Sequence, residues 1–319
     1  MHSIATPALW AVFALVVVVA LAVDFLVLRA HGPHRVTLRE ALWWSLGWIA
    51  LALAFNAALW LWTDAAAGRE MANDIGLEFL AGYLIEKSLA VDNIFVFLMI
   101  FNAFRVPPEQ RQRALMLGVL GALVLRAVMI FIGAVLVARF HAILYVFGVF
   151  LIVTAIRMLR SGGPAPDIQN HRALGWMRRW LHLTGEYHGS RLSVIEDGRR
   201  AFTPLFVVLA LIAICDVIFA VDSIPAIFAV TEDPFIVLTS NVFAVLGLRA
   251  LFFLLAGMAD RFHLLGYGLA AVLFFIGVKM LLAGIWPIPI GIALGVVALL
   301  IAGSIVASLY WPPANRRDV

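Results

Sequence analysis

Nine long apolar runs divide this sequence and limit the surroundings in which it can fold. Hydrophobic residues make up 64% of the 319 residues and charged residues only 13%, whereas a soluble domain is about half apolar and a quarter charged. Most runs are long enough for a helix to cross the ~30 Å hydrocarbon core of a bilayer. The sequence therefore predicts an all-α, polytopic membrane protein of about nine transmembrane helices, which cover residues 8–28, 40–62, 75–103, 113–138, 141–159, 203–231, 235–258, 263–284 and 287–310.

The basic residues predict how this bundle is oriented. Seventeen of the 23 lysines and arginines fall in the segments that follow the first, third, fifth, seventh and ninth helices, while the opposite loops hold only Arg69 and Arg139. Because lysine and arginine accumulate in cytoplasmic loops, we expect the N-terminus outside and the C-terminus in the cytoplasm. The basic residues lack the interleaved aromatic residues on which nucleic-acid bases stack. We therefore expect the protein to interact with the lipid bilayer and not with a nucleic acid.

Two stretches inside the apolar runs resemble each other. Glu86-Lys-Ser-Leu-Ala-Val-Asp92-Asn93 and Asp216-Val-Ile-Phe-Ala-Val-Asp222-Ser223 each place two carboxylates six residues apart. The next helix of each copy carries Leu-Arg-Ala, at residues 125–127 and 248–250. Each copy spans three helices, so the second copy enters the membrane from the opposite side. The sequence thus predicts an inverted repeat of three helices, a construction common among secondary transporters.

This repeat divides the chain into five parts. Residues 1–74 hold two helices outside the repeat, 75–159 form the first copy, 203–284 form the second, and 285–319 hold the last helix and a cytoplasmic tail. Residues 160–202 form a basic cytoplasmic loop, in which 172–183 has the pattern of an amphipathic helix lying on the membrane surface. A metal sensor in this loop is a weaker alternative, because its candidate ligands match no strong spacing motif: His171, His182, Glu186 and His188.

Ionised groups inside a membrane are costly, so the four repeated acids are the candidate functional site. In a straight helix, six residues leave two side chains ~120° apart around the axis and ~9 Å apart along it. Neither stretch can therefore easily clamp one ion by itself. Inversion suggests pairing between the copies, Glu86 with Asp222 and Asp92 with Asp216. The predicted metal ligands are Glu86, Asp92, Asp216 and Asp222.

Further oxygen ligands and balancing charges lie beside these acids. Asn93 and Ser223 adjoin them, and Pro225 leaves the Val221 carbonyl without its usual helical donor. Asp24 lies near the cytoplasmic end of the first helix, where it is either interfacial or part of the lining. Oxygen ligands of this kind suit hard divalent cations such as Mn²⁺, Mg²⁺ or Ca²⁺. The candidate balancing cations are Lys87, Arg126 and Arg249; the four acids against the two arginines leave −2, the charge that one divalent ion neutralises.

Purely structural roles for these residues stay open. The acids and bases can instead form buried salt bridges that fix helix packing. Cys215 is the single cysteine, which excludes disulfide frameworks and thiolate metal sites within one chain. Its apolar surroundings favour a small buried side chain.

These stretches resemble the motifs of the TerC/Alx family of integral membrane proteins. Residues 82–93 are similar to the first motif, and residues 216–231, continued by 235–241 and 246–249, are similar to the second. The similarity extends over most of the chain and points to the Alx branch. The resemblance implies a bacterial inner-membrane protein linked to manganese homeostasis that exports Mn²⁺. It implies no cofactor beyond the transported ion, and the residues themselves support only a hard divalent cation.

Three functions remain to be compared. The first is a secondary transporter, not an enzyme, that exports Mn²⁺ by alternating access, with proton coupling left open. The second is a membrane partner that delivers metal to exported enzymes. The third is an intramembrane aspartyl protease, which needs two transmembrane aspartates. No Gly-x-Gly-Asp precedes any of the acids, and a protease leaves the inverted repeat unexplained.

Overall fold

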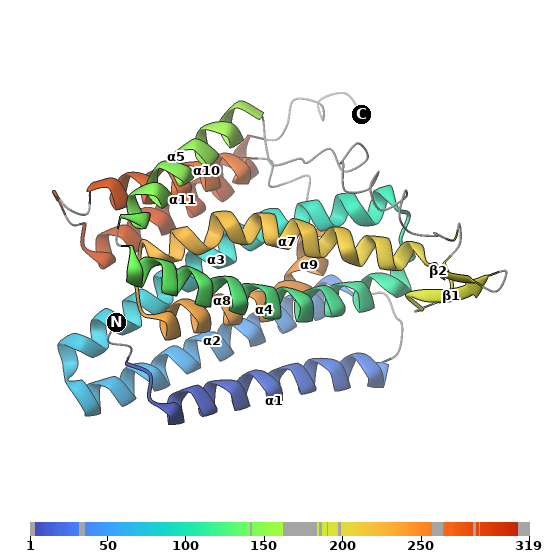
Figure 1. Ribbon diagram of the computed structural model, residues 1–319, viewed down its shortest axis with the longest axis horizontal. Coiled ribbons are helices and arrows are strands. Elements are labelled where there is room, and N and C mark those ends of the chain that lie inside the picture. Colours follow the sequence, from blue (N-terminus) through green and yellow to red (C-terminus); the bar gives the residue numbers. More distant parts are fainter. Residues whose placement is uncertain are drawn as a thin grey trace.

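Helices account for nearly all of the structure. In a computed structural model (Figure 1), the described residues are 4–31, 36–140, 142–161, 184, 187–189, 191–196, 199–256, 264–282, 285–286 and 288–311. The helices are α1 (Pro7–His31), α2 (Leu38–Ala67), α3 (Arg69–Ala103), α4 (Pro108–Arg139), α5 (Ile143–Ser161), α7 (Pro204–Phe228), α8 (Pro234–Leu246), α9 (Leu248–Ala256), α10 (Leu265–Leu282) and α11 (Ile290–Tyr310).

Each stretch predicted to be helical is helical in the described part of the chain, with one difference. The stretch predicted as a single helix over 235–258 forms two helices, α8 and α9, which meet at Gly247 and are bent by 43°. Length and composition qualify seven of the described helices as membrane spans, or eight when α8 and α9 count as one bent span. Helix α3 is long enough at 35 residues but carries too many charges to qualify by composition.

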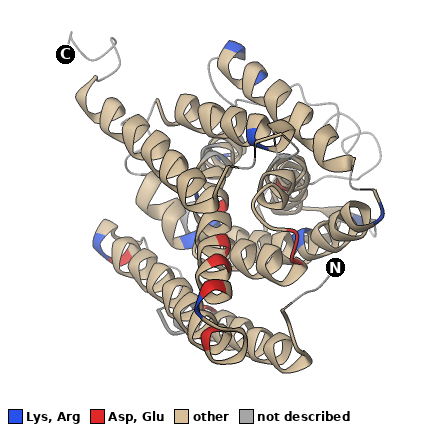
Figure 2. Ribbon diagram, turned by 90° about the vertical axis from the view of Figure 1, so that its left-hand side faces the viewer, with Lys and Arg blue, Asp and Glu red and all other residues tan. Residues whose placement is uncertain are grey.

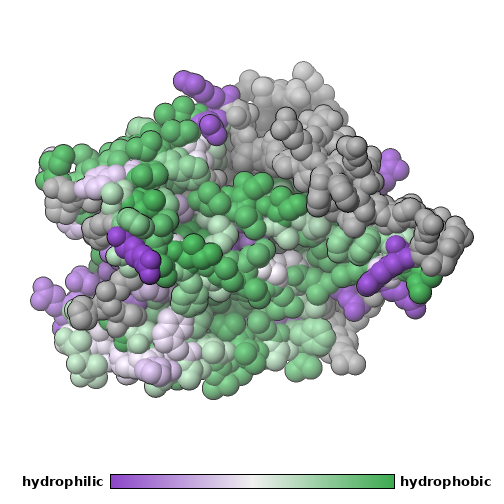
Figure 3. All heavy atoms as spheres, viewed as in Figure 1, coloured by the Kyte–Doolittle hydropathy of each residue, from purple (hydrophilic) through white to green (hydrophobic). Residues whose placement is uncertain are grey.

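The surface agrees with a membrane setting. Many valine and leucine side chains are exposed on the helices, among them Leu15 on α1, Val124 on α4 and Leu299 on α11. Figure 3 shows apolar residues covering the middle of the visible face, with hydrophilic residues gathered toward its two ends. Apolar side chains in this position are stable against lipid but not against water. The protein is therefore an all-α, multi-pass membrane protein.

Three apolar clusters fill the bundle, and two of them lie one toward each end of its long axis. The first cluster includes Phe79, Ile130 and Phe235, and the second includes Ile94 and Leu211. Helix α3 passes through both clusters and packs against α2, α7 and α8. It is the central element of the bundle in Figure 1.

Helices α5 and α10 pack along each other more closely than side chains normally allow. Their contact is formed at Gly148 and Gly277, where a Cβ atom on Gly277 would lie 2.7 Å from the Gly148 carbonyl oxygen. Small residues let membrane helices approach backbone to backbone, which increases their van der Waals contact. This crossing joins the third helices of the two predicted repeat copies.

Local sequence signals explain several helix ends. Thr37 caps α2 by accepting a hydrogen bond from the Glu40 N–H at 3.2 Å. Asp233 caps α8, where its carboxylate accepts from the Phe235 N–H at 2.8 Å. Such side chains satisfy N–H groups that lack a helical partner. The other Asp233 oxygen accepts from the Ile4 N–H at 2.8 Å, which ties the start of the described chain to the start of α8.

The loop between α5 and α7 contains a β-hairpin that we did not predict. Strands β1 (Ser193–Glu196) and β2 (Arg199–Phe202) pair antiparallel, with Ser193 opposite Phe202 and Glu196 opposite Arg199. The sequence does carry a signal for it, since Asp-Gly between two short β-prone runs is typical of a hairpin. The predicted amphipathic helix over 172–183 lies outside the described residues. So do three of the four candidate sensor ligands, all except the exposed His188.

Replacing Gly277 by alanine should separate α5 from α10. The added methyl group would collide with the Gly148 carbonyl and lie 3.2 Å from the Ile152 nitrogen, and neither backbone atom can move easily. Overpacking of this kind costs about 1–3 kcal/mol, which should lower the thermal unfolding midpoint in detergent. Gly295→Ala in α11 is the matched control, because nothing lies within 4 Å of its Cβ position. Equal midpoints for the two variants would contradict the close crossing.

Candidate functional site

A layer of charged residues lies between the two apolar clusters. It is formed by α3, α4 and α7, and in each helix the charged residue stands in sequence between a member of the first cluster and a member of the second. Such a position places ionisable groups deep inside the bundle, where they need partners. The three residues are Glu86 between Tyr83 and Ala90, Arg126 between Ala122 and Ile130, and Asp216 between Cys215 and Ala220.

Arg126 is the centre of this layer. Its Nη1 donates to Glu86 Oε1, while its Nη2 and Nε donate to Asp216 Oδ1 at 3.0 and 3.2 Å. The three side chains are 1%, 0% and 3% exposed. The planar guanidinium can bind two carboxylates at once because its N–H groups point outward in a fixed fork. One acid from each predicted repeat copy is thereby held on a single cation.

The acidic residues are not spread evenly over the bundle. Figure 2 shows them concentrated along one helix through the middle of the view, in keeping with the five acids that α3 carries. Only part of this acidic column is paired with arginine in the described structure. The Arg126 contact involves one of these five acids, Glu86.

Several buried oxygen atoms beside Arg126 lack a good hydrogen bond. Ser223 lies beside the Glu86 carboxylate, yet its hydroxyl and Glu86 Oε2 have no well-formed partner among the described side chains. Asn93, with its amide oriented to suit its neighbours, accepts from Arg126 Nη2 at 3.3 Å and donates to the Leu89 carbonyl. Buried polar atoms without partners are costly. These oxygens are consequently available to a ligand of positive charge.

Asn241 of α8 is a site candidate that the sequence analysis did not select. Its side chain is fully buried, and neither its amide oxygen nor its amide nitrogen has a partner among the described side chains. Members of the first apolar cluster stand on both sides of it along α8, Leu238 and Val242 among them. An amide in the middle of an apolar helix was the available signal.

Asp24 has a different role from the ligand or lining residue that we expected. It accepts from Arg249 Nε at 3.1 Å and also from Arg249 Nη2, which joins α1 to α9 through a buried pair. Arg249 is thus paired with Asp24, whereas Glu86 and Asp216 are paired with Arg126. The earlier charge count changes accordingly, because the four acids against Arg126 alone leave a formal charge of −3.

Lys87 and Val221 also differ from expectation. Lys87 donates to the Ala244 carbonyl at 3.2 Å, near the junction of α8 and α9, and is not bonded to the acid pair. Helix α7 continues through Pro225 to Phe228, so Val221 lies within an unbroken helix. The Val221 side chain is exposed on the outer face of that helix. Its carbonyl still lacks the N–H that proline cannot supply.

Two of the four predicted ligands cannot be placed, because the Asp92 and Asp222 side chains lie outside the described residues. The pairing of Glu86 with Asp222 and of Asp92 with Asp216 therefore stays a prediction. Among the described side chains, no group of three or more histidine, cysteine, aspartate or glutamate residues gathers as a metal site. What the structure brings together is Glu86 and Asp216, a pair that we did not predict.

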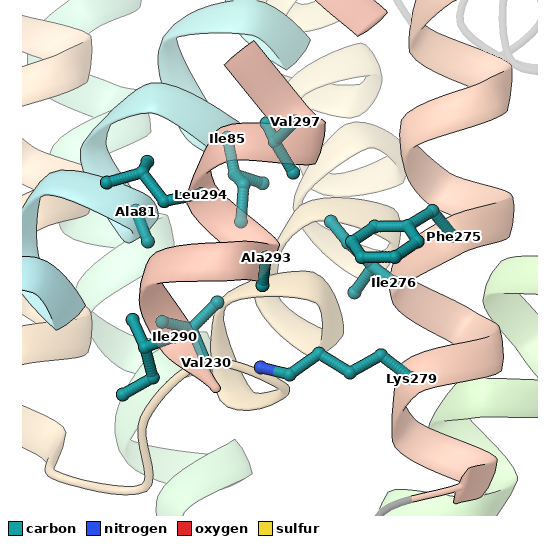
Figure 4. Close-up of a pocket in the computed structure, with 10 residues that line it drawn as sticks. All are labelled: Ala81, Ile85, Val230, Phe275, Ile276, Lys279, Ile290, Ala293, Leu294 and Val297. Carbon is teal, nitrogen blue, oxygen red and sulfur yellow. The ribbon is translucent and has the colours of Figure 1, made fainter. Parts of the chain in front are cut away.

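A second polar region lies toward the first apolar cluster. Thr231 donates to Glu78 Oε2 at 2.6 Å, and Lys279 donates to the Ala229 carbonyl at 3.0 Å. Figure 4 shows the Lys279 ammonium reaching into a narrow cleft that is otherwise lined by apolar residues of α3, α10 and α11, with Val230. Its walls lack carboxylates, so this cleft is not suited to a bare cation.

The sequence can now be compared with known proteins. The profile of the family described as "Integral membrane protein TerC family" matches residues 71–316, which include Glu86, Arg126, Asp216 and Arg249. The chain belongs to the TerC family. This result confirms the resemblance that the two acidic motifs indicated.

Several relatives match the chain over most of its length. Proteins named "Putative membrane-bound redox modulator Alx" from Escherichia coli K12 and Salmonella typhi are 51% and 50% identical over 93% of this chain and 92% of their own length. The "Uncharacterized membrane protein STKORF319" of Myxococcus xanthus is 46% identical over 96% of this chain and 93% of its own. No solved structure matches the chain.

Replacing Arg126 by methionine should destabilise the protein strongly. The change keeps much of the side-chain volume but leaves Glu86 and Asp216 buried without their shared cation, and breaking a buried pair in this way costs about 3–5 kcal/mol. The thermal unfolding midpoint in detergent measures the loss. Arg69→Met is the control, because the Arg69–Asp64 pair is largely exposed and should contribute less than about 1 kcal/mol. Similar shifts in both variants would show that the central contact has no special role.

Proposed function

We propose that this protein is a secondary transporter that exports Mn²⁺, or a closely similar divalent cation, across the bacterial inner membrane. The observation that carries the proposal is the contact between Glu86 of α3 and Asp216 of α7 on Arg126. These acids lie inside a membrane bundle, at equivalent positions of two similar segments. Intramembrane acids of this kind line ion paths in transporters.

The proposed topology has nine membrane crossings and an inverted repeat. Helices α3, α4 and α5 form one copy, and α7, α8 with α9, and α10 form the other. The packing supports this arrangement, since α3 contacts α8 as α4 contacts α7, and α5 pairs with α10. In the proposed orientation the N-terminus is outside, the β-hairpin is cytoplasmic, and the transport site lies near the membrane centre at the interface of the copies.

In this proposal Arg126 occupies the cation position while no metal is bound. A divalent ion would bind the Glu86 and Asp216 carboxylates together with Asp92, Asp222 and neighbouring neutral oxygens. Glu86 Oε2, Ser223 Oγ and the Asn241 amide are buried and lack well-formed partners. Such oxygen ligands suit Mn²⁺ and other hard divalent ions. Ion entry would require Arg126 to give up at least one carboxylate.

Charge supports a cation and leaves room for protons. The four acids with Arg126 carry a formal charge of −3 when all are ionised, so one divalent ion leaves −1. A proton on one acid, or Lys87 nearby, would complete the balance. Exchange of Mn²⁺ against protons is therefore part of the proposal. The choice of Mn²⁺ rests on the family resemblance, because the ligand types alone do not separate Mn²⁺ from Mg²⁺.

The relatives' name suggests a redox role as a second function. Cys215 is the only cysteine of this chain, and it is buried within the second apolar cluster. A single buried thiol cannot form an intramolecular disulfide. The proposal therefore gives Cys215 no redox role. Delivery of metal to exported enzymes remains a compatible variant, since it uses the same ion site.

Transport in proteoliposomes tests this function directly. We expect Glu86→Gln and Asp216→Asn each to lower the initial rate of Mn²⁺ flux at least about tenfold, because each removes a charged ligand that no other residue replaces. Asp92→Asn and Asp222→Asn should act in the same direction. The measurement is Mn²⁺ quenching of a dye enclosed in vesicles that contain only this protein.

Two controls make the result specific. Glu70→Gln changes an exposed acid on the same helix α3 and should leave flux unchanged. Cys215→Ser should also retain flux, whereas a redox mechanism at this thiol would abolish it. Normal flux in the Glu86 and Asp216 variants would remove these carboxylates from the transport path.

A further inference from the structure

The two proposed repeat copies place Arg126 and Arg249 at matching positions, within Leu125-Arg126-Ala127 and Leu248-Arg249-Ala250. Both arginines are buried, at 1% and 9% exposure. Their partners nevertheless differ, because Arg126 binds the Glu86–Asp216 pair and Arg249 binds Asp24. Matching residues therefore have unequal surroundings within one structure.

The helices that carry the two arginines differ in shape as well. Helix α4 runs unbroken through Arg126, whereas α8 and α9 are bent by 43° at Gly247, two residues before Arg249. A Cβ atom on Gly247 would lie 2.8 Å from Lys87 Nζ and 3.0 Å from Trp48 Cβ. The bend is thus closely packed against side chains of α2 and α3.

Three contacts near this bend come from outside the second copy. Asp24 belongs to α1, Trp48 to α2 and Lys87 to α3. Lys87 also donates a hydrogen bond to the Ala244 carbonyl. The position that matches Lys87 in the second copy is Val217, which has no charge to offer α4. The asymmetry between the copies is consequently encoded in the sequence.

Arg249 lies on a helix that reaches the acid pair's neighbourhood. Helix α9 packs against α3, which carries Glu86, and against α4, which carries Arg126. A two-fold relation that exchanges the copies exchanges Glu86 with Asp216 and Arg126 with Arg249. In the symmetry-related state, Arg249 would therefore bind the same two carboxylates, Glu86 and Asp216. An inverted repeat reaches its opposite state when its halves exchange conformations.

We propose that Arg126 and Arg249 alternate on the Glu86–Asp216 pair, and that Asp24 holds Arg249 while Arg126 is bound there. The proposal rests on the alternating-access function above. It makes Asp24 a positioning residue for Arg249 and not an ion ligand. It also gives α1, a helix outside the repeat, control over which of the two states the transporter favours. The opposing view is a static Asp24–Arg249 pair that only anchors α1.

The two views predict opposite signs in a double mutant. With Arg126→Met alone, the acid pair loses its cation. If the arginines alternate, adding Asp24→Asn frees Arg249 to replace Arg126, so D24N/R126M should be more stable than R126M. If the pair is static, two separate lesions add, and D24N/R126M should be less stable than R126M.

Cys215 supplies a readout that needs no transport. It is buried beside Asp216, so its labelling rate with a maleimide reports opening of the charged layer. We expect R126M to raise this rate at least about tenfold, as loss of a buried ion pair implies. D24N/R126M should bring the rate and the unfolding midpoint back toward wild type. Full-length protein in detergent with a metal chelator is used, so the result does not depend on Mn²⁺ flux.

Two controls identify the rescuing group. The triple variant D24N/R126M/R249M should lose the rescue, because the second arginine is then absent. D64N/R126M should show none, because Asp64 pairs with the exposed Arg69. If R126M yields too little folded protein for labelling, the monodisperse yield of R126M and D24N/R126M is compared in the same way. A double variant no better than R126M, by yield or by labelling, overturns the exchange even if the transport experiment succeeds.

Discussion

The guanidinium of Arg126 is the contact on which the interior of this protein depends. Two carboxylates from separate helices cannot stay ionised deep inside a membrane bundle without a cation between them. Arg126 meets this need with a planar fork that reaches Glu86 on α3 and Asp216 on α7. Apolar side chains can pack against both sides of the charged layer only because its charges are paired. Packing of α3, α4 and α7 thus follows from one three-residue contact.

The sequence was sufficient to predict the class of fold, because apolar runs and their polar boundaries are local properties. The helix positions, the importance of Glu86 and Asp216, and the family all came from such patterns. The partners of the charges could not be predicted in this way. Two inverted copies suggest where acids approach each other, but Asp24 lies outside the repeat. Its claim on Arg249 depends on how α1 packs against α9, which no spacing within the repeat reveals.

Other differences have equally specific causes. Pro225 lies inside α7, and the helix continues through it, since neighbouring helices can support a proline within a membrane. The bend lies instead at Gly247, where a Cβ atom would contact Lys87 and Trp48 closely. Asn241 was passed over because a single amide in an apolar run is usually a packing residue. Its importance depends on burial without a partner, which only a structure can supply.

The close crossing of α5 and α10 has a mechanical consequence. Gly148 and Gly277 bring two backbones together at one point, so the third helices of the proposed copies cannot slide apart without breaking that contact. They can still turn about it. Relative to the charged layer, this crossing would act as a fulcrum, and a small rotation there would displace α3 and α7 in opposite directions along their lengths. The glycine pair would then set the axis of the motion, while the arginines and acids set its end points.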